Sequence, residues 1–138
     1  MTREDGEAVR IYRRYNDAEN ARDQETMAAL LDPTIAVEMN GKPALSSADD
    51  DAEAMAGLFD AYPDYRREIV AVVDGGTEAA VRWRMLGTPA ARLADRLPAL
   101  ELEGCSFVTV RDGRMTAAWL YGAEGVLQGL LRLAAEAR

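Results

Sequence analysis

Apolar residues recur at intervals of three and four along the first part of the chain. Within residues 4–22 they form a stripe of small, aliphatic and tyrosine side chains, namely Ala8, Ile11, Tyr12, Tyr15 and Ala18. This spacing predicts a helix with one buried face. Asp23 can cap a second, short helix, which we expect to run through Leu31 because Asp32 and Pro33 then stop it.

The following segment predicts a strand, a turn and a third helix. Residues 34–39 alternate between apolar and polar positions and end in the turn dipeptide Asn40-Gly41. Ser46 or Ser47 opens a helix that Pro63 ends, and the acidic residues 49–51 suit its first turn, where negative charge complements the helix dipole. The buried face that we expect for this helix is Ala52, Met55, Ala56 and Phe59.

Long alternating segments in the second half of the chain predict two antiparallel hairpins. The first joins residues 65–73 to 77–86 through Asp74-Gly75-Gly76, and the second joins 100–110 to 114–121 through Asp112-Gly113. Residues 88–98 contain two prolines and predict a loop over one end of the sheet. We expect a bulge at Gly104 to bend the sheet. Residues 124–137 are rich in leucine at helical spacing.

Helices grouped before antiparallel strands indicate an α+β fold. We expect a strongly curved antiparallel sheet that wraps around the N-terminal helices, forming a cone whose mouth can hold a small apolar ligand. The chain has 138 residues, of which 49% are hydrophobic, and this favours a single domain covering residues 1–138.

Composition then removes several classes of function. With 16 basic and 24 acidic residues the formal charge is -8, which argues against nucleic acid or a membrane surface as a partner. The chain has no histidine and a single cysteine, Cys105, so His-ligated zinc, Ser-His-Asp and Cys-His catalysis and internal disulfides are excluded. We expect no cofactor and no metal. The charged N-terminal residues and the lack of a long apolar run predict a cytoplasmic protein.

Short motifs occur in a characteristic order along nearly the whole chain. They are residues 15–23 (YNDAENARD), 32–41, 62–64 (YPD), 81–84 (VRWR) with Gly87-Thr88, 111–114 (RDGR) and 119–122 (WLYG). In this order they resemble the cone-shaped superfamily that contains nuclear transport factor 2, the steroid Δ-isomerases, the limonene-type epoxide hydrolases and the SnoaL-like polyketide cyclases. The resemblance implies the cystatin-like cone and leaves isomerase, hydrolase, cyclase and non-enzyme functions open.

The resemblance also implies roles for individual residues. Tyr15 matches a tyrosine that donates a hydrogen bond to an enolate oxygen in the steroid isomerases, and Glu38 matches their carboxylate base. Asp64 lies close to the position of a second acid in epoxide-opening cyclases. Ser106 falls where the isomerases hold a protonated acid. Aldol-type cyclases carry an aspartate where this chain has Ala123, and they commonly use a histidine, which is absent here.

Each of these residues also has an ordinary structural interpretation. Strand alternation places Glu38 opposite the most apolar side of its strand, Tyr15 can be a core aromatic, and Asp64 can cap a turn. We expect Arg82 and Arg84 to point outward. The aromatic residues expected to form the core or the pocket wall, and so to bind substrate, are Phe59, Trp83, Trp119 and Tyr121.

These observations predict a cofactor-independent cyclase or isomerase that acts by acid–base chemistry on a polyketide-like or terpenoid-like intermediate. Glu38 is the expected base, and Tyr15 or Asp64 the expected donor. One alternative is an epoxide hydrolase or epoxide-opening cyclase that uses Glu38 and Asp64 as a pair, because two nearby carboxyls divide into an acid and a base. Another is a non-catalytic module for ligand binding or dimerisation. The expected partners are a small apolar substrate and a second copy of the chain.

Overall fold

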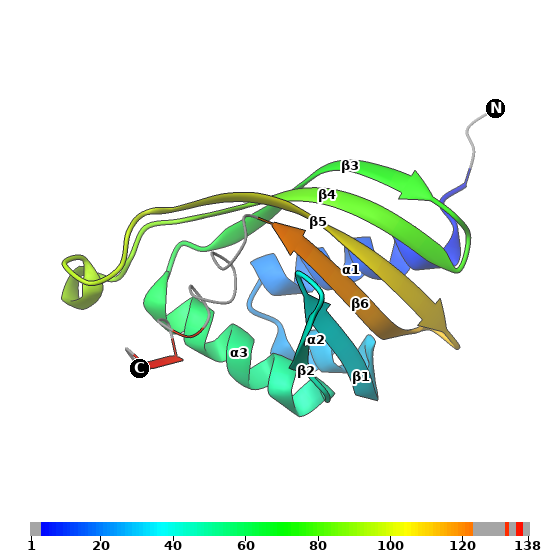
Figure 1. The fold of residues 1–138 in the computed structure, drawn as a ribbon, viewed down its shortest axis with the longest axis horizontal. Helices are drawn as coiled ribbons and strands as arrows, with labels where there is room; N and C mark the ends of the chain where they lie inside the picture. Colours follow the sequence, from blue (N-terminus) through cyan, green and yellow to red (C-terminus); the bar gives the residue numbers. More distant parts are fainter. Residues whose placement is uncertain (1–3, 123–131, 133–134, 137–138) are drawn as a thin grey trace.

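The three α-helices lie on one side of a curved sheet, and four consecutive strands follow the last of them (Figure 1). A computed structural model describes residues 4–122, 132 and 135–136. The helices are α1 (Glu7–Asn20), α2 (Gln24–Ala29) and α3 (Ala48–Ala61), with a short 3-10 helix at Ala91–Leu93. The strands are β1 (Leu31–Met39), β2 (Lys42–Leu45), β3 (Arg66–Asp74), β4 (Glu78–Gly87), β5 (Leu100–Arg111) and β6 (Arg114–Gly122). The predicted α+β class is confirmed.

The six strands form one mixed sheet in the order β2-β1-β6-β5-β4-β3. All neighbouring strands are antiparallel except β1 and β6, which run parallel. The expectation of a purely antiparallel sheet therefore needs this one correction. The long strands arch over α1, so that the sheet has a concave inner face toward the helices and a convex outer face (Figure 1).

The turn residues act as the sequence predicts. Asn40 and Gly41 have φ of 51° and 83°, and Asp112 and Gly113 have φ of 53° and 78°. Two successive residues with positive φ make the tight turn whose twist matches an antiparallel pair. The first of these turns leads into β2, a short strand that the sequence analysis did not predict.

The boundary between α2 and β1 lies earlier than predicted. The helix ends at Ala29 and the strand already begins at Leu31, so that Pro33 lies inside β1. The pairing of β1 with β6 is irregular between Leu31 and Ala36. Proline cannot donate a hydrogen bond to a ladder, and this irregular stretch is where a strand can tolerate it.

Gly104 does not form the predicted bulge. The register between β4 and β5 is continuous through the pair Trp83 and Gly104. A Cβ at Gly104 would instead lie 2.6 Å from the Trp83 ring and 2.6 Å from the backbone oxygen of Tyr121. Glycine is therefore required here by close packing of the indole. The register irregularities of the neighbouring strand pairs β3–β4 and β5–β6 fall near Val70 and Val110.

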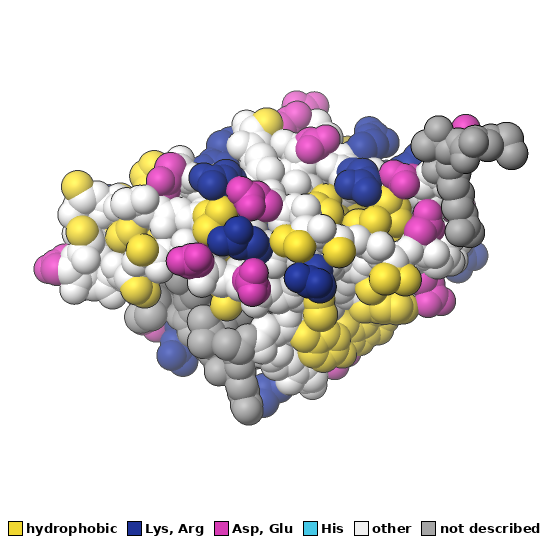
Figure 2. All heavy atoms as spheres, turned by 90° about the horizontal axis from the view of Figure 1, so that it is seen from above, with side chains coloured by type: hydrophobic (Ala, Val, Ile, Leu, Met, Phe, Trp, Pro, Cys, Tyr) yellow, Lys and Arg dark blue, Asp and Glu magenta, His cyan; other side chains and the backbone are white. Residues whose placement is uncertain are grey.

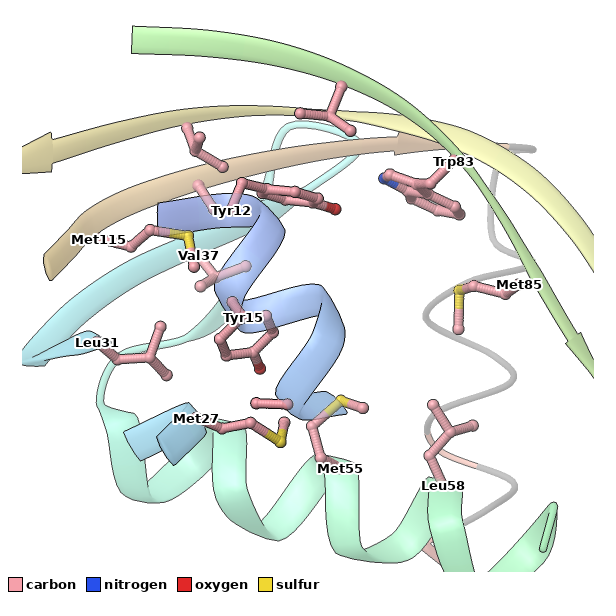
Figure 3. Close-up of a cluster of buried hydrophobic side chains, with 14 of the residues drawn as sticks. Tyr12, Tyr15, Met27, Leu31, Val37, Met55, Leu58, Trp83, Met85 and Met115 are labelled. Carbon is pink, nitrogen blue, oxygen red and sulfur yellow. The ribbon is translucent and has the colours of Figure 1, made fainter. Parts of the chain in front are cut away.

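The inner face of the sheet and the helices enclose one apolar core. Figure 3 shows Tyr12 and Tyr15 of α1, Met55 and Leu58 of α3, and Met85 of β4 directed into this common interior. The predicted face of α1 is buried as expected. For α3 the buried face is rotated about the helix axis relative to the prediction. Its buried residues are Met55, Gly57, Leu58 and Ala61, whereas Ala52, Ala56 and Phe59 are only partly buried.

Two further expectations concern the ends of the sheet and of the chain. The loop 88–98 contains the 3-10 helix and buries Leu93 and Leu97. The leucine-rich segment 124–137 lies almost entirely outside the described residues. Within the part of the chain that the structure describes, no helix has the length and apolar character needed to span a bilayer.

Candidate functional site

A cavity of about 70 Å³ lies between α1, α3 and the inner face of the sheet. Most of its wall is apolar, and the described apolar residues that line it are Leu31, Ile35, Val37, Met39, Leu45, Ala54, Met55, Leu58, Met85, Val108, Met115, Ala118 and Leu120. Six polar residues also line it, namely Tyr12, Tyr15, Glu19, Asp51, Arg67 and Ser106. A mostly apolar hollow with a few converging polar groups is the usual form of a small-molecule site.

The first polar group is a pair formed by Tyr15 and Asp51. The Tyr15 hydroxyl on α1 donates a hydrogen bond of 2.5 Å to Oδ2 of Asp51, which lies in the first turn of α3. Burial raises the pKa of Asp51 from 3.8 to about 6, although the hydrogen bond from Tyr15 acts in the opposite direction. Asp51 is therefore a carboxylate near neutral pH that can accept a proton and return it.

Local sequence explains why Asp51 faces the cavity. Ser47 caps α3 by accepting a hydrogen bond from the Asp50 backbone N–H at 3.0 Å. The Asp50 carboxylate in turn accepts from the backbone N–H of Ser46 at 3.0 Å. This reciprocal cap fixes the start of the helix and so directs Asp51 along the same face as Met55 and Leu58.

The second polar group is a buried ion pair. Glu19 of α1 has no exposed surface, and its Oε2 lies 3.4 Å from Nε of Arg67 on β3. The Tyr65 hydroxyl donates to the same oxygen at 2.5 Å. Burial lowers the pKa of Arg67, but Glu19 and the neighbouring tyrosines outweigh it and raise that pKa, so that the guanidinium stays charged. The Asn20 side chain holds the Arg67 backbone in place, because it hydrogen-bonds to both the N–H and the C=O of Arg67.

The third polar group consists of the hydroxyls of Tyr12 and Ser106 with their hydrogen-bond donors. The Trp83 indole N–H donates to Oγ of Ser106 at 2.9 Å, and Arg67 donates to the Tyr12 hydroxyl at 3.4 Å. Hydrogen bonds from Ser106 and Arg67 favour the ionised form of Tyr12, whereas burial is the larger effect and raises its pKa. Tyr12 and Ser106 thus offer hydroxyl groups to the cavity beside a positive charge.

Glu38 is not part of this cavity. Its neighbours Val37 and Met39 line the cavity, so strand alternation puts Glu38 on the outer face, where it pairs in register with Trp119. The cavity-facing position that the family resemblance implied for Glu38 is therefore wrong. The alternation of the strand favoured the outward position.

Asp64 is likewise remote from the cavity. It is exposed at the junction of α3 and β3, and its Oδ1 accepts the Thr88 backbone N–H at 2.6 Å. This hydrogen bond lowers the pKa of Asp64. Asp64 is thus a turn residue. The epoxide-opening alternative requires Asp64 and Glu38 to share a cavity, and they do not.

The aromatic residues expected in the pocket wall have other positions. Trp83 is buried behind the polar residues, where its ring lies 4.9 Å from the Arg67 guanidinium, and it does not line the cavity. Phe59 contacts Tyr65 and the Arg22 guanidinium. Trp119 and Tyr121 lie with Phe107 around a shallow depression on the outer face. The predicted substrate contacts of these aromatic residues therefore need correction.

The arginines of β4 point outward, as expected. Arg84 lies within 4.0 Å of three glutamates of the neighbouring strands, Glu68, Glu101 and Glu103. Figure 2 shows the result as basic and acidic side chains interspersed with apolar ones on the outer face. Among the described residues, no group of three acidic or cysteine side chains is arranged to hold a metal ion.

Sequence analysis missed Asp51, Glu19 and Arg67 as cavity residues, although periodicity contained a signal for each. Glu19 follows Tyr15 by four residues on the buried stripe of α1. Asp51 precedes Met55 by four residues on α3. Arg67 shares one face of β3 with Ile69. All three are charged, so a rule that assigns only apolar residues to the interior does not find them.

Comparison with known proteins agrees with the fold. Residues 12–118 match the model of the SnoaL-like domain. No curated protein matches the sequence.

Several solved structures share the fold. A cystatin-fold protein from Novosphingobium aromaticivorans superposes with a TM-score of 0.72 at 16% identity, covering 82% of this chain and 96% of that one. A candidate SnoaL-like polyketide cyclase from Jannaschia sp. CCS1 gives 0.72 at 14% identity, covering 95% and 96%. A candidate ketosteroid isomerase from Kribbella flavida gives 0.66 at 22% identity, covering 86% and 79%. At these identities the similarity concerns the fold.

Proposed function

Because this chain belongs to the SnoaL-like domain family, we propose that it is a cofactor-independent acid–base enzyme that cyclises or isomerises a polyketide-like or terpenoid-like intermediate. The observation that carries the proposal is Asp51, a carboxylate with a pKa of about 6 that is held by Tyr15 at the wall of an apolar cavity. Asp51 takes the role that the sequence suggested for Glu38.

Both reaction types can begin with the same proton transfer. Asp51 removes a proton from the carbon next to a carbonyl, and the electron pair of the broken C–H bond moves onto the carbonyl oxygen to form an enolate. In an isomerisation the protonated Asp51 then returns the proton to another carbon of the conjugated system. In a cyclisation the enolate carbon attacks a second carbonyl carbon, and the oxygen of that carbonyl takes up the proton that Asp51 had removed.

The polar end of the cavity suits the developing negative charge. Tyr12, Ser106 and Arg67 place two hydroxyls and a guanidinium at the same wall. Oriented donors in a site that excludes water stabilise an oxyanion strongly, and loss of one such donor typically costs about 3 kcal/mol. We therefore assign oxyanion stabilisation to Tyr12 and Ser106 and the orientation of the base to Tyr15.

The volume of the cavity limits what enters it. About 70 Å³ is well below the roughly 300 Å³ that commonly encloses a complete drug-sized ligand. Four methionines, Met39, Met55, Met85 and Met115, line the cavity, and their unbranched side chains can change rotamer at low cost. A larger substrate thus enters by displacing methionine side chains.

A small β,γ-unsaturated ketone tests the proposal without knowledge of the natural substrate. Wild-type protein should accelerate the conversion of 3-cyclohexen-1-one to its conjugated isomer, monitored by ultraviolet absorbance, with a rate that rises with pH through about 6. Asp51→Asn should reduce this acceleration by about 100-fold or more, since removal of a general base typically has this effect.

Asp49→Asn is the matched control, because Asp49 belongs to the same acidic turn but is exposed. It should retain the wild-type rate. Equal rates for the two variants, or no acceleration by the wild-type protein, would contradict the assignment of Asp51 and favour a non-catalytic binding module.

A further inference from the structure

We infer that the polar end of the cavity recognises a neutral hydroxyl group of the ligand, which donates a hydrogen bond to Oε1 of Glu19. This inference rests on the proposed function, because it names a feature of the substrate that the same cavity takes. The ligand expected here is a hydroxylated, otherwise apolar carbonyl compound, and Glu19 is its specificity-determining residue.

The first observation is an unused oxygen on a buried carboxylate. Glu19 lines the cavity and is completely buried. Its Oε2 is occupied by Tyr65 and Arg67. Its Oε1 has no hydrogen-bond partner among the described residues. A buried carboxylate oxygen without a donor is unfavourable, so a ligand that supplies a donor gains affinity at this position.

The second observation is that suitable groups for a hydroxyl lie next to this oxygen. Arg67 joins Glu19 to Tyr12, because its Nε lies 3.4 Å from the carboxylate while its Nη1 donates to the Tyr12 hydroxyl. A ligand hydroxyl both donates and accepts. It can donate to Glu19 and accept from the Arg67 guanidinium, which also lines the cavity, whereas an ether or a ketone can only accept.

Charge favours a neutral ligand over an anionic one. The described charged residues that line the cavity are Glu19, Asp51 and Arg67, so carboxylates outnumber cations. The one guanidinium is already paired with Glu19. A ligand carboxylate would face two protein carboxylates in a poorly solvated cavity, which costs more than the contact with Arg67 returns.

Three ring compounds of similar size separate these chemistries. Cyclohexanol donates and accepts, methoxycyclohexane only accepts, and cyclohexanecarboxylate is anionic. Binding is measured by titration with NMR detection of the two indole N–H signals of the chain. Trp83 reports on the cavity through its bond to Ser106, and Trp119 reports on the outer face.

Cyclohexanol should shift the Trp83 signal and bind about tenfold or more tightly than either other compound, as expected for one hydrogen bond to a charged group. Glu19→Gln should remove this preference, because the amide that pairs with Tyr65 then turns an N–H toward the cavity. Asp17→Asn, an exposed change on the same helix, is the matched control and should preserve the preference.

Equal affinity for the alcohol and the ether, tightest binding of the carboxylate, shifts confined to Trp119, or no binding would each overturn the inference, and the wild-type protein alone can show any of them. The measurement involves no turnover. Loss of the alcohol preference in Glu19→Gln alongside unchanged isomerisation in Asp51→Asn would therefore support this inference while refuting the proposed reaction.

Discussion

On each face of the sheet an arginine pairs with glutamate, and the surroundings of the two pairings are opposite. On the inner face Arg67 pairs with the fully buried Glu19, and one carboxylate oxygen lacks a partner among the described residues. On the outer face Arg84 meets three glutamates whose side chains are 43–74% exposed. Water can solvate the outer glutamates directly, whereas the Arg67 and Glu19 side chains of the inner cluster are only 10% and 0% exposed.

This difference supports the inner face as the candidate functional face. Exposed ion pairs usually contribute little to stability and need no function to explain them. A buried pair costs desolvation energy, and well-packed apolar residues would often serve stability as well or better. Together with the raised pKa of Asp51, the inner cluster is therefore a feature that stability alone does not explain.

The largest effect should follow from removing one partner of the inner cluster. Arg67→Met leaves the buried Glu19 without its cation and should lower the free energy of unfolding by about 3–5 kcal/mol, measured by urea denaturation at pH 7. A loss below about 1 kcal/mol would mean that water reaches this cluster as freely as the outer one.

Removal of the Asp51 charge should instead increase the free energy of unfolding. The folded protein holds this proton more tightly than the unfolded chain, because the pKa rises from 3.8 to about 6. The ionised carboxylate therefore destabilises the fold increasingly as pH rises from about 4 to 6, and fully above 6, by about 3 kcal/mol.

Asp51→Asn should thus be more stable than wild type at pH 8 by up to this amount, and the difference should shrink toward pH 4. Thermal unfolding at a series of pH values checks it. A constant difference across the series would show that Asp51 titrates as an exposed carboxyl.

The contact between β5 and the Trp83 ring should give a smaller effect. Gly104→Ala places a methyl group 2.6 Å from the indole and should destabilise the protein by about 1–3 kcal/mol through overpacking. Gly122→Ala is the matched control, because Gly122 pairs with Gly104 in register and its added methyl meets only an ordinary contact at 3.7 Å. Equal stability of the two variants would show that both the indole and the backbone at Tyr121 can move aside.

The smallest effect should come from the outer cluster. Arg84→Met removes a cation shared by three exposed glutamates and should change the free energy of unfolding by about 1 kcal/mol or less, an effect that high salt reduces further. Urea denaturation with and without added salt measures it. A loss as large as that of Arg67→Met would remove the contrast between the two faces.

Sequence patterns predicted the elements well but not the contents of the cavity. Turn dipeptides such as Asn40-Gly41 are local signals, because two residues with positive φ determine the turn. Which oxygen of Glu19 lacks a partner depends instead on Tyr65 and Arg67, which are 46 and 48 positions away in sequence, just before and within β3. Periodicity could place Glu19 on the buried face, but it could not show what surrounds it.

The error at Glu38 has a different origin. Alternation along β1 favoured the outer face, and the family resemblance overruled it. A strand shifted by one residue exchanges its faces, so a motif counted from Gly41 is accurate only to the register of the hairpin. For Asp64 the interpretation as a turn residue agrees with its hydrogen bond to Thr88.

The parallel contact of β1 with β6 has a consequence for how the molecule folds. Met115 donates its backbone N–H to Leu30 at 2.8 Å, and Leu31 lies opposite Met115 in the sheet. Both Leu31 and Met115 line the cavity, although most of the chain separates them. Closing so long a loop is slow, so the part of the cavity wall that β1 and β6 form together should assemble late in folding. A nascent chain thus acquires this cavity only after its last described strand has been synthesised.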